Sequence, residues 1–320
     1  MKNYKPIIIV AGEPNSIFFE IFFKVIKKKI KSPIILIASK QLILKQAKIL
    51  KKKINLNTIS ETEILKKVDN LKKINLIDVN FEQKIAFDKI TAKSNNYITD
   101  CFNFALKLLK HGVSDKLVNG PISKKTFLKN RYNGITEYLA DKTNTKKFAM
   151  IIYNKNLSVC PLTTHVPIKY VSKMIHKLEL IDKVKLIDNF WKKEFGKQVK
   201  IGVTGLNPHC ESIDSFNEDK NIILPTIKKL KELKYNIHGP SAADTIFLKN
   251  NRKKFDLIIG MYHDQVLTPI KTLFEYDAIN VTIGLPFIRV SPDHGPNETM
   301  LGKNKSNYLS LLNSIKFLDY

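Results

Sequence analysis

The chain has 320 residues, 43% of them hydrophobic, and a formal net charge of +25. It can bury a large core, but it has no run of about 18 apolar residues that predicts a membrane-spanning helix, no signal-peptide pattern, and only three widely spaced cysteines, so no disulfide framework is expected. The charge lies in lysine runs typical of solvated helix faces, with few arginines and no interleaved aromatic residues, which favours a cytoplasmic globular protein over a specific nucleic-acid binder.

The first 120 residues alternate between short apolar runs and amphipathic segments. Strands are predicted at 6–10, 34–38 and 116–118, and helices are predicted after Ser16, at 41–53 and at 99–109. This alternation predicts a mostly parallel sheet covered by helices, which is an α/β fold.

The rest of the chain begins with two apolar runs, 148–153 and 157–160, whose short polar spacer predicts a β-hairpin. Further strands are predicted at 199–203, 255–259 and 279–283. Helices are predicted near 169–178, at 180–195 and at 221–233, and helices are expected to close the chain. The segment 238–240, His-Gly-Pro, is interpreted as a loop. No G-x-G-x-x-G occurs, so the Rossmann dinucleotide fingerprint is absent.

Three histidines, His165, His209 and His263, each follow an apolar run. They are separated by 44 and 54 residues, which is unlike a zinc finger and suits a catalytic site assembled from several loops. Each could be an ordinary hydrogen-bonded histidine, but together they predict a metal held by imidazoles with open positions for a substrate. Cys210 is either a neighbour of that metal or a small buried side chain.

Other polar residues are candidates for substrate contacts. Asp244 follows a small-residue turn before a predicted helix, where it could cap the helix, orient a ligand histidine or relay protons. Lys271, Asn280 and Arg289 fall within 19 residues around two predicted turns. If they converge they suit a phosphate or carboxylate, although surface positions are equally open. Residues 293–295, Asp-His-Gly, predict a tight turn.

Six segments resemble the motifs of one family, the 4-hydroxythreonine-4-phosphate dehydrogenases of pyridoxine (vitamin B6) biosynthesis. They are Leu162–Pro167, Gly205–His209, Pro240–Thr245, Met261–Gln265, Gly284–Arg289 and Asp293–Gly295. The resemblance is colinear from about residue 117 to 303.

The resemblance implies an isocitrate/isopropylmalate dehydrogenase-like fold, with three α/β/α layers and the active site in a cleft. We expect two closely joined subdomains, residues 1–125 with 290–320 and residues 126–289, the second carrying the metal ligands and the dimer interface. It also implies a homodimer with shared active sites.

The implied activity is an NAD(P)-dependent oxidation of 4-phosphohydroxy-L-threonine at its 3-hydroxyl, with metal-assisted decarboxylation to 3-amino-2-oxopropyl phosphate. The implied metal ligands are His165, His209 and His263, one of them from the partner subunit, holding Zn²⁺, Mg²⁺ or Co²⁺. The implied substrate contacts are Thr136, Lys271, Asn280 and Arg289. Asp244 is assigned to catalysis, and Asp293, His294 and Gly295 are assigned to binding NAD or NADP without a Rossmann motif.

Two positions depart from the family pattern. Ile135 stands where histidine is usual; losing that hydrogen bond could cost about 1–3 kcal/mol or indicate another four-carbon phosphorylated hydroxy acid, of the threonate or erythronate phosphate type. The segment 14–20 lacks two usual glycines, which predicts an altered backbone or a strained turn. The altered loop and the positive charge leave a third alternative, a non-catalytic polyanion-binding relative.

Overall fold

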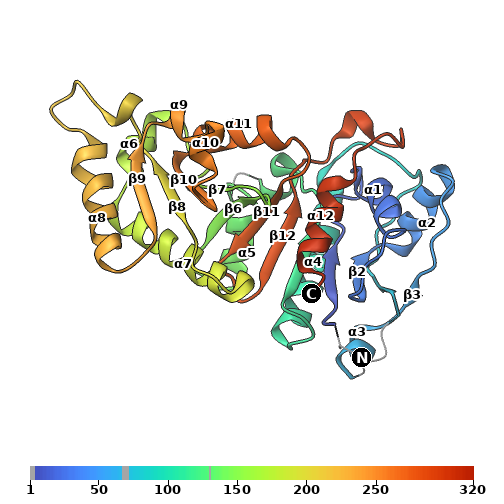
Figure 1. Cartoon of the computed structure of the whole chain (residues 1–320). Coiled ribbons are helices and arrows are strands. Elements are labelled where there is room, and N and C mark those ends of the chain that lie inside the picture. The colour runs from blue at the N-terminus through green and yellow to red at the C-terminus, as the bar shows by residue number, and fades with distance from the viewer. Residues whose placement is uncertain (1–3, 67–71, 130) are drawn as a thin grey trace. The chain divides into compact units, whose positions relative to one another are not determined.

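The computed structural model describes residues 4–66, 72–129 and 131–320, and the chain divides into two compact units (Figure 1). Unit 1 comprises residues 1–139 and 286–320, and unit 2 comprises residues 140–285. Residues 126–139 and 286–289, which the sequence assigned to the second subdomain, therefore belong to unit 1. None of the helices in the described ranges combines the length and the apolar content needed to cross a bilayer.

Unit 1 contains a parallel sheet in the order β3-β4-β2-β1-β5-β12. Its strands are β1 (Ile7–Val10), β2 (Ile34–Ala38), β3 (Asn57–Thr58), β4 (Ile74–Asp78), β5 (Lys116–Asn119) and β12 (Ile288–Pro292). The central strands are isoleucine-rich because helices bury both faces of a parallel sheet. All carboxyl ends meet at one edge, where α/β sheets bind ligands.

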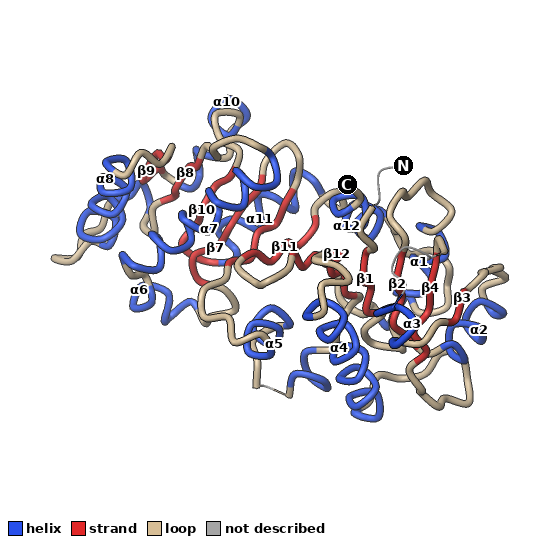
Figure 2. Tube along the Cα trace, turned by 90° about the horizontal axis from the view of Figure 1, so that it is seen from below, coloured by secondary structure: helices blue, strands red, loops and turns tan. Residues whose placement is uncertain are grey.

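Helices cover both faces of the unit 1 sheet. They are α1 (Phe18–Val25), α2 (Lys40–Ile49), α3 (Glu61–Lys66), α4 (Asn95–Lys110) and α12 (Leu309–Leu318), while α5 (Ile135–Lys142) runs across residue 139, where the units divide. Helix α4 packs on β1 and β2, and α12 packs on β5 and β12. Figure 2 shows α4 on one side of these strands and α1 and α12 on the other, so unit 1 has three layers.

Unit 2 contains a mixed sheet in the order β11-β6-β7-β10-β8-β9. Its strands are β6 (Ala149–Tyr153), β7 (Ser158–Thr163), β8 (Ile201–Thr204), β9 (Ile237–Ser241), β10 (Leu257–Tyr262) and β11 (Ile279–Ile283). Strand β6 is antiparallel to β7 and β11, which confirms the predicted hairpin. Strands β7, β10, β8 and β9 are mutually parallel, so they end at one edge.

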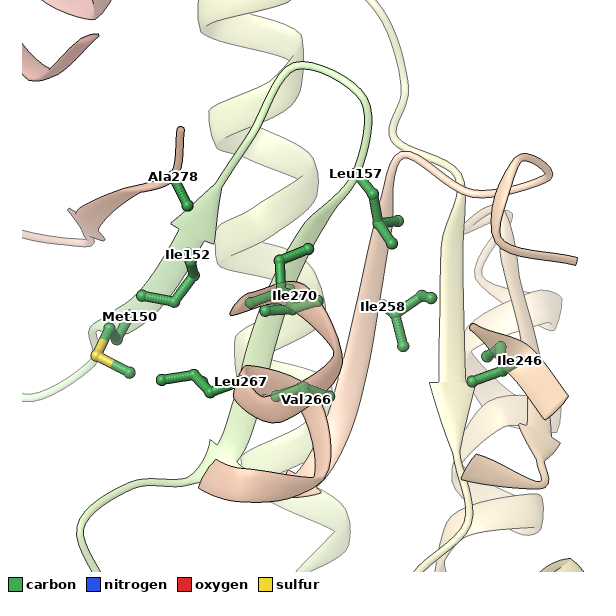
Figure 3. Packing of buried hydrophobic residues seen from close by; sticks show 10 residues of the cluster. Met150, Ile152, Leu157, Ile246, Ile258, Val266, Leu267, Ile270 and Ala278 are labelled. Carbon is green, nitrogen blue, oxygen red and sulfur yellow. The ribbon is translucent and has the colours of Figure 1, made fainter. Parts of the chain in front are cut away.

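The helices of unit 2 are α6 (Val171–Met174), α7 (Lys177–Phe195), α8 (Leu224–Glu232), α9 (Ala243–Ile246), α10 (Lys249–Arg252) and α11 (His263–Phe274). Helix α11 packs on β7 and β10. In Figure 3 its Val266, Leu267 and Ile270 lie over Ile152 and Ile258 of the strands. Each fully buried aliphatic side chain contributes about 1.5–3 kcal/mol, so this packing fixes the beginning of α11 against the sheet.

Several elements differ from the predictions. Residues 238–240, interpreted as a loop, form part of β9, because pairing with β8 overrides their turn-like sequence. Strand β12 lies where no strand was predicted, because helices were expected to close the chain. Within the described residues, the closing α-helix is α12. The helix predicted near 169–178 is reduced to α6, four residues long.

Candidate metal and substrate site

The parallel strands of unit 2 bring the predicted metal site to one edge of the sheet. His165 lies two residues after β7, His263 directly follows β10, His209 follows β8, and Asp244 follows β9. Because these strands end at the same edge, the topology assembles residues that are far apart in the sequence.

His165 and His263 lie together at this edge. Their ring centres are 5.5 Å apart, with an angle of 39° between the planes. Two imidazoles on one tetrahedral ion, at metal–nitrogen distances of about 2.0–2.1 Å, place their ring centres roughly 5 Å apart. His263 Nδ1 lies 2.6 Å from Asp264 Oδ1. When Nδ1 donates to this carboxylate, Nε2 keeps its lone pair for a metal, so the pair fits a divalent ion.

His209 does not join this pair into a complete site. Within the described parts of this chain, no three His, Cys, Asp or Glu side chains form a group that could hold a metal ion. His209 is exposed, and its backbone is left-handed, with φ 55°. One chain therefore supplies two clustered imidazoles and a third on a separate loop.

The loop that presents His209 is held by a buried carboxylate, Asp219, which is 1% exposed. Asp219 Oδ1 accepts from Leu206 N at 2.7 Å, and Oδ2 accepts from Asn207 N at 3.1 Å and Asn207 Nδ2 at 3.0 Å. A Cβ at Gly205 would lie 2.7 Å from Asp219 Oδ1, so glycine is needed for this close approach. The loop before His209 is therefore fixed.

A second side chain, Gln265, joins the ends of β8 and β10. Its Oε1 accepts from Thr204 Oγ1 and from Met261 N, both at 2.7 Å, and its Nε2 donates to Gly205 O at 2.8 Å. Our sequence reasoning assigned roles to neither Asp219 nor Gln265. Gln265 had a signal, because it stands in the motif that contains His263, whereas no local pattern marks Asp219.

Asp244 and Cys210 are placed differently from the sequence-based alternatives. Asp244 is an exposed residue inside the first turn of α9, whose N-cap is Ala242, so the capping prediction is wrong. Cys210 is half-buried. The pKa of its thiol is raised, mainly by burial and to a smaller extent by the nearby Asp219 carboxylate. Its Sγ packs against Gly205, where an added Cβ would lie 2.7 Å from the sulfur.

In unit 1, Arg289 on β12 is 1% exposed and forms a fixed cationic centre. Its Nε donates to Asn119 Oδ1 at 2.6 Å, at the end of β5, and its Nη1 donates to Thr136 Oγ1 at 3.4 Å. Burial lowers the pKa of Arg289 to about 9, and the Glu137 carboxylate opposes this change. Burying a guanidinium is costly, so an anionic ligand near Arg289 would be stabilised. Ile135, beside Thr136, is half-buried and offers no side-chain hydrogen bond.

Lys271 and Asn280 lie on regular elements, and Asn280 stands in the strand that was predicted at 279–283. Lys271 is in the last turn of α11, and Asn280 is the second residue of β11. Asn280 pairs with Ile152, which pairs with Val159, four residues before Thr163 at the end of β7. At about 3.3 Å per residue, Asn280 lies roughly 13 Å along the strands from the histidine edge. The fold therefore does not bring Asn280 to the histidines within one chain.

The predicted cofactor turn follows β12 at the ligand-binding edge of unit 1. Asp293 N donates to Ser310 Oγ at 2.9 Å, and His294 Nδ1 lies 3.0 Å from Gly295 O. A Cβ at Gly295 would meet no atom within 4 Å, so the backbone here is open to a ligand. The turn continues into Pro296, whose carbonyl accepts from Ile17 N in the β1–α1 loop at 3.1 Å. These contacts hold the turn in place and leave the backbone of Gly295 open.

The architecture places the chain in a fold class that includes dehydrogenases of solved structure. An isocitrate dehydrogenase from Methylococcus capsulatus, 8% identical, matches it with a TM-score of 0.50 over 98% of this chain and 84% of that one, which shows likeness of fold alone. A putative 4-hydroxythreonine-4-phosphate dehydrogenase structure from Salmonella typhimurium matches with a TM-score of 0.84 and 27% identity, over 98% of both chains.

The family follows from the sequence comparisons. A profile described as "Pyridoxal phosphate biosynthetic protein PdxA" matches residues 29–318. The 4-hydroxythreonine-4-phosphate dehydrogenase of Sulfurihydrogenibium sp. (strain YO3AOP1) is 36% identical over 96% of this chain and 95% of its own length. A putative D-threonate 4-phosphate dehydrogenase of Oceanobacillus iheyensis is 32% identical over 97% and 96%. The chain belongs to the PdxA family.

Proposed function

We propose that this protein is an NAD(P)-dependent, divalent-metal-dependent dehydrogenase that oxidises and decarboxylates 4-phosphohydroxy-L-threonine in pyridoxine phosphate biosynthesis. The observation that carries the proposal is the pair of imidazoles, His165 and His263, at a separation suited to one ion. Family membership supplies the substrate, because relatives of similar length are named for it.

In the proposed reaction, the chain's residues bind and orient the reacting groups. A bound divalent ion would supply a Lewis acid for the hydroxyl and the later carbonyl, and the nicotinamide would accept the hydride. His165 and His263 would hold that ion, and Asp264, as acceptor from His263 Nδ1, would fix the tautomer of His263. Asp244, which follows β9, is proposed to move a proton. Zn²⁺, Co²⁺ and Mg²⁺ are the candidates, and imidazole ligands favour the first two.

Arg289 and Thr136, held together in unit 1, are proposed to bind the anionic groups of the substrate. Lys271 and Asn280 complete the proposed set. Asp293, His294 and Gly295 are proposed to bind NAD or NADP. This assignment follows the fold rule that ligands bind at the carboxyl ends of parallel strands.

We propose that the active enzyme is a homodimer in which the partner subunit supplies the third histidine, His209. Two segments support this. Ile168 and Leu178 are each 73% exposed near α6, and Ile213 and Phe216 are 106% and 54% exposed on the loop after His209. Large apolar side chains gathered on neighbouring segments indicate a protein interface. Light scattering should show a dimer that Ile213→Ser/Phe216→Ser weakens, while Leu233→Ser, exposed on unit 2 elsewhere, does not.

A second candidate substrate is a threonate phosphate. Ile135 favours it, because isoleucine cannot give the hydrogen bond that histidine would give the amino-acid substrate, and a 32% identical relative is named a putative D-threonate 4-phosphate dehydrogenase. The two candidates differ only in an amino against a hydroxyl group beside the carboxylate, so a direct comparison of kcat/KM is informative.

The test is NAD(P)H formation from each substrate by the chelator-treated protein, before and after adding Zn²⁺, Co²⁺ or Mg²⁺. We expect turnover that requires metal, that is lost in His263→Ala, and that Ile135→His shifts toward the amino-acid substrate. A folded, metal-loaded dimer without turnover on either substrate would refute the proposal. A polyanion-binding role would instead show tight nucleic-acid binding at physiological salt without metal-dependent turnover.

A further inference from the structure

Unit 1 contains a cavity that is lined by none of the residues given a role above. Its volume is about 680 Å³, within the range of roughly 300–1,000 Å³ typical of small-molecule sites. It is lined by Asn15, Gln41, Lys45, Phe81, Glu82, Gln83, Lys84, Ile85, Asp88, Lys89, Thr91, Lys93 and Ser94, here called the lysine pocket.

The lysine pocket stands where ligands bind in an α/β sheet. Its walls come from the segments that follow β1, β2 and β4, which are parallel neighbours. Because all three strands end at one edge, the cavity opens beyond their carboxyl ends, as ligand crevices of this fold class do.

The segment 81–94, which forms most of the wall, is fixed by side chains from other elements. Asn15 and Gln83 exchange two amide hydrogen bonds of 2.9 and 3.0 Å. Lys45 Nζ donates to Gln83 O, and the fully buried Gln46 donates to Ala86 O at 3.0 Å. These bonds tie the wall to the β1–α1 loop and to α2, so the cavity is preformed.

Charge and ring chemistry specify the ligand. Four lysines line the cavity against two carboxylates, Glu82 and Asp88, and none of these six forms an ion pair in the described structure, although salt bridges occur elsewhere. An excess of ammonium groups at a polar cavity favours a phosphate. Phe81 adds an aromatic wall, backed by Tyr97 at 5.0 Å between ring centres. Aromatic walls favour flat rings.

We propose that the lysine pocket binds a phosphate ester of a compound that also contains a flat aromatic ring. Two sources share this chemistry. One is the adenosine phosphate end of the dinucleotide, in which case the inference rests on the proposed function. The other is a pyridoxine-type phosphate, the class of compound that the family's description names, acting as a separate ligand.

The test is titration calorimetry on the full-length protein, without substrate or added metal, so that a failure of turnover does not decide it. The probes are AMP, pyridoxine 5′-phosphate, which has no aldehyde to react with lysines, and inorganic phosphate. The pocket variant is Lys84→Gln/Lys89→Gln. The matched control, Lys228→Gln/Lys231→Gln, removes the same charge from exposed positions of α8.

We expect at least one aromatic phosphate to bind more tightly than inorganic phosphate, and the pocket variant to weaken it about tenfold or more. The control pair should leave it unchanged. Phe81→Leu should weaken the aromatic ligand while leaving weak binding of inorganic phosphate as it is. If NAD displaces the ligand and the pocket variant also weakens NAD, the occupant is the cofactor's adenosine end; independent binding identifies a separate ligand.

Three results would overturn the proposal. They are the absence of binding by AMP and pyridoxine 5′-phosphate up to millimolar concentrations, equal losses in the pocket and control variants, and equal affinity for inorganic phosphate and both ring-bearing probes. Circular dichroism and thermal melts of each variant check that it is folded.

Discussion

Asp219→Asn tests the most specific positional claim, that a buried carboxylate holds the loop of His209. The substitution keeps the shape of the side chain but replaces one acceptor oxygen with an NH₂ donor. With Oδ1 retained on Leu206 N, the new donor faces the two amide groups of Asn207, at the positions now 3.1 and 3.0 Å from Oδ2.

The magnitude follows from these two bonds. Hydrogen bonds to charged groups contribute about 1.5–3 kcal/mol each, and relaxation toward water recovers part of the loss. We therefore expect the free energy of unfolding to fall by about 2–4 kcal/mol in urea titrations. Since residues that orient metal ligands typically change metal affinity about 10–100-fold, Co²⁺ titration should show at least a tenfold weaker site.

The matched control is Asp214→Asn, which makes the same chemical change at an exposed position of the same loop. It should alter neither stability nor Co²⁺ affinity. If Asp219→Asn behaves like this control, the carboxylate does not hold the loop. If stability falls but Co²⁺ affinity is unchanged, the loop is held as described and His209 is not a ligand.

Three further predictions concern single hydrogen-bonding groups. Asn119→Ala should raise KM for the substrate about tenfold with little change in kcat, because Arg289 loses the acceptor of its Nε. Asn119→Asp supplies an acceptor again and should restore stability. It should not restore KM, since a carboxylate would compete with the anionic substrate for Arg289. Gln265→Leu should lower stability by about 2–4 kcal/mol and weaken Co²⁺ binding, since the three hydrogen bonds of the Gln265 side chain to the ends of β8 and β10 are lost. Unchanged Co²⁺ affinity would contradict the positioning role of Gln265. Burial raises the pKa of the Glu13 carboxyl above its ordinary 4.5, so the folded chain binds the carboxyl proton more tightly than the unfolded chain does. The folded chain therefore loses stability as pH rises from 4.5 through the raised pKa. Urea titrations between pH 4 and 8 should therefore show Glu13→Gln gaining on the native chain as pH increases, and a constant difference would refute this linkage.

The sequence predicted the strands that carry apolar runs, and the reason is burial on both faces. Residues 34–38 and 279–283 match β2 and β11 as expected, because continuous isoleucine and valine runs have few other uses in a globular chain. Strand β12 was missed because Arg289 and Ser291 interrupt its apolar pattern. Arg289 is nevertheless buried, since Asn119 and Thr136 satisfy its donors from elsewhere in the fold.

The candidate site shows the same limit. That three histidines follow strands could be read from the sequence, but which of them meet depends on strand order, β7-β10-β8, which places His165 beside His263. The loop that leads to His209 is held at Leu206 and Asn207 by the Asp219 carboxylate, and no local pattern encodes that contact.

The loop at residues 14–20 departs from the family motif, which raised the alternative that the protein is a non-catalytic relative. Of the two predicted alternatives, an altered backbone or a strained turn, the strained turn is wrong, because none of the residues 14–20 has a positive φ. Ser16 Oγ donates to Glu13 O at 2.7 Å and accepts from Phe18 N at 3.3 Å, so a hydroxyl satisfies the turn in place of glycine's backbone freedom. Phe18 and Phe19, the first two residues of α1, are each 1% exposed and pack in the core.

The loop's other polar side chain, Asn15, is 4% exposed, and its amide makes the pair with Gln83 that closes the lysine pocket. A glycine at position 16, as in the family pattern, would leave the two hydrogen bonds of the Ser16 hydroxyl unmade. At the two positions where the family has glycine, Ser16 forms a hydrogen-bonded turn and Phe18 packs in the core, so the altered loop by itself gives no support to a non-catalytic polyanion-binding scaffold.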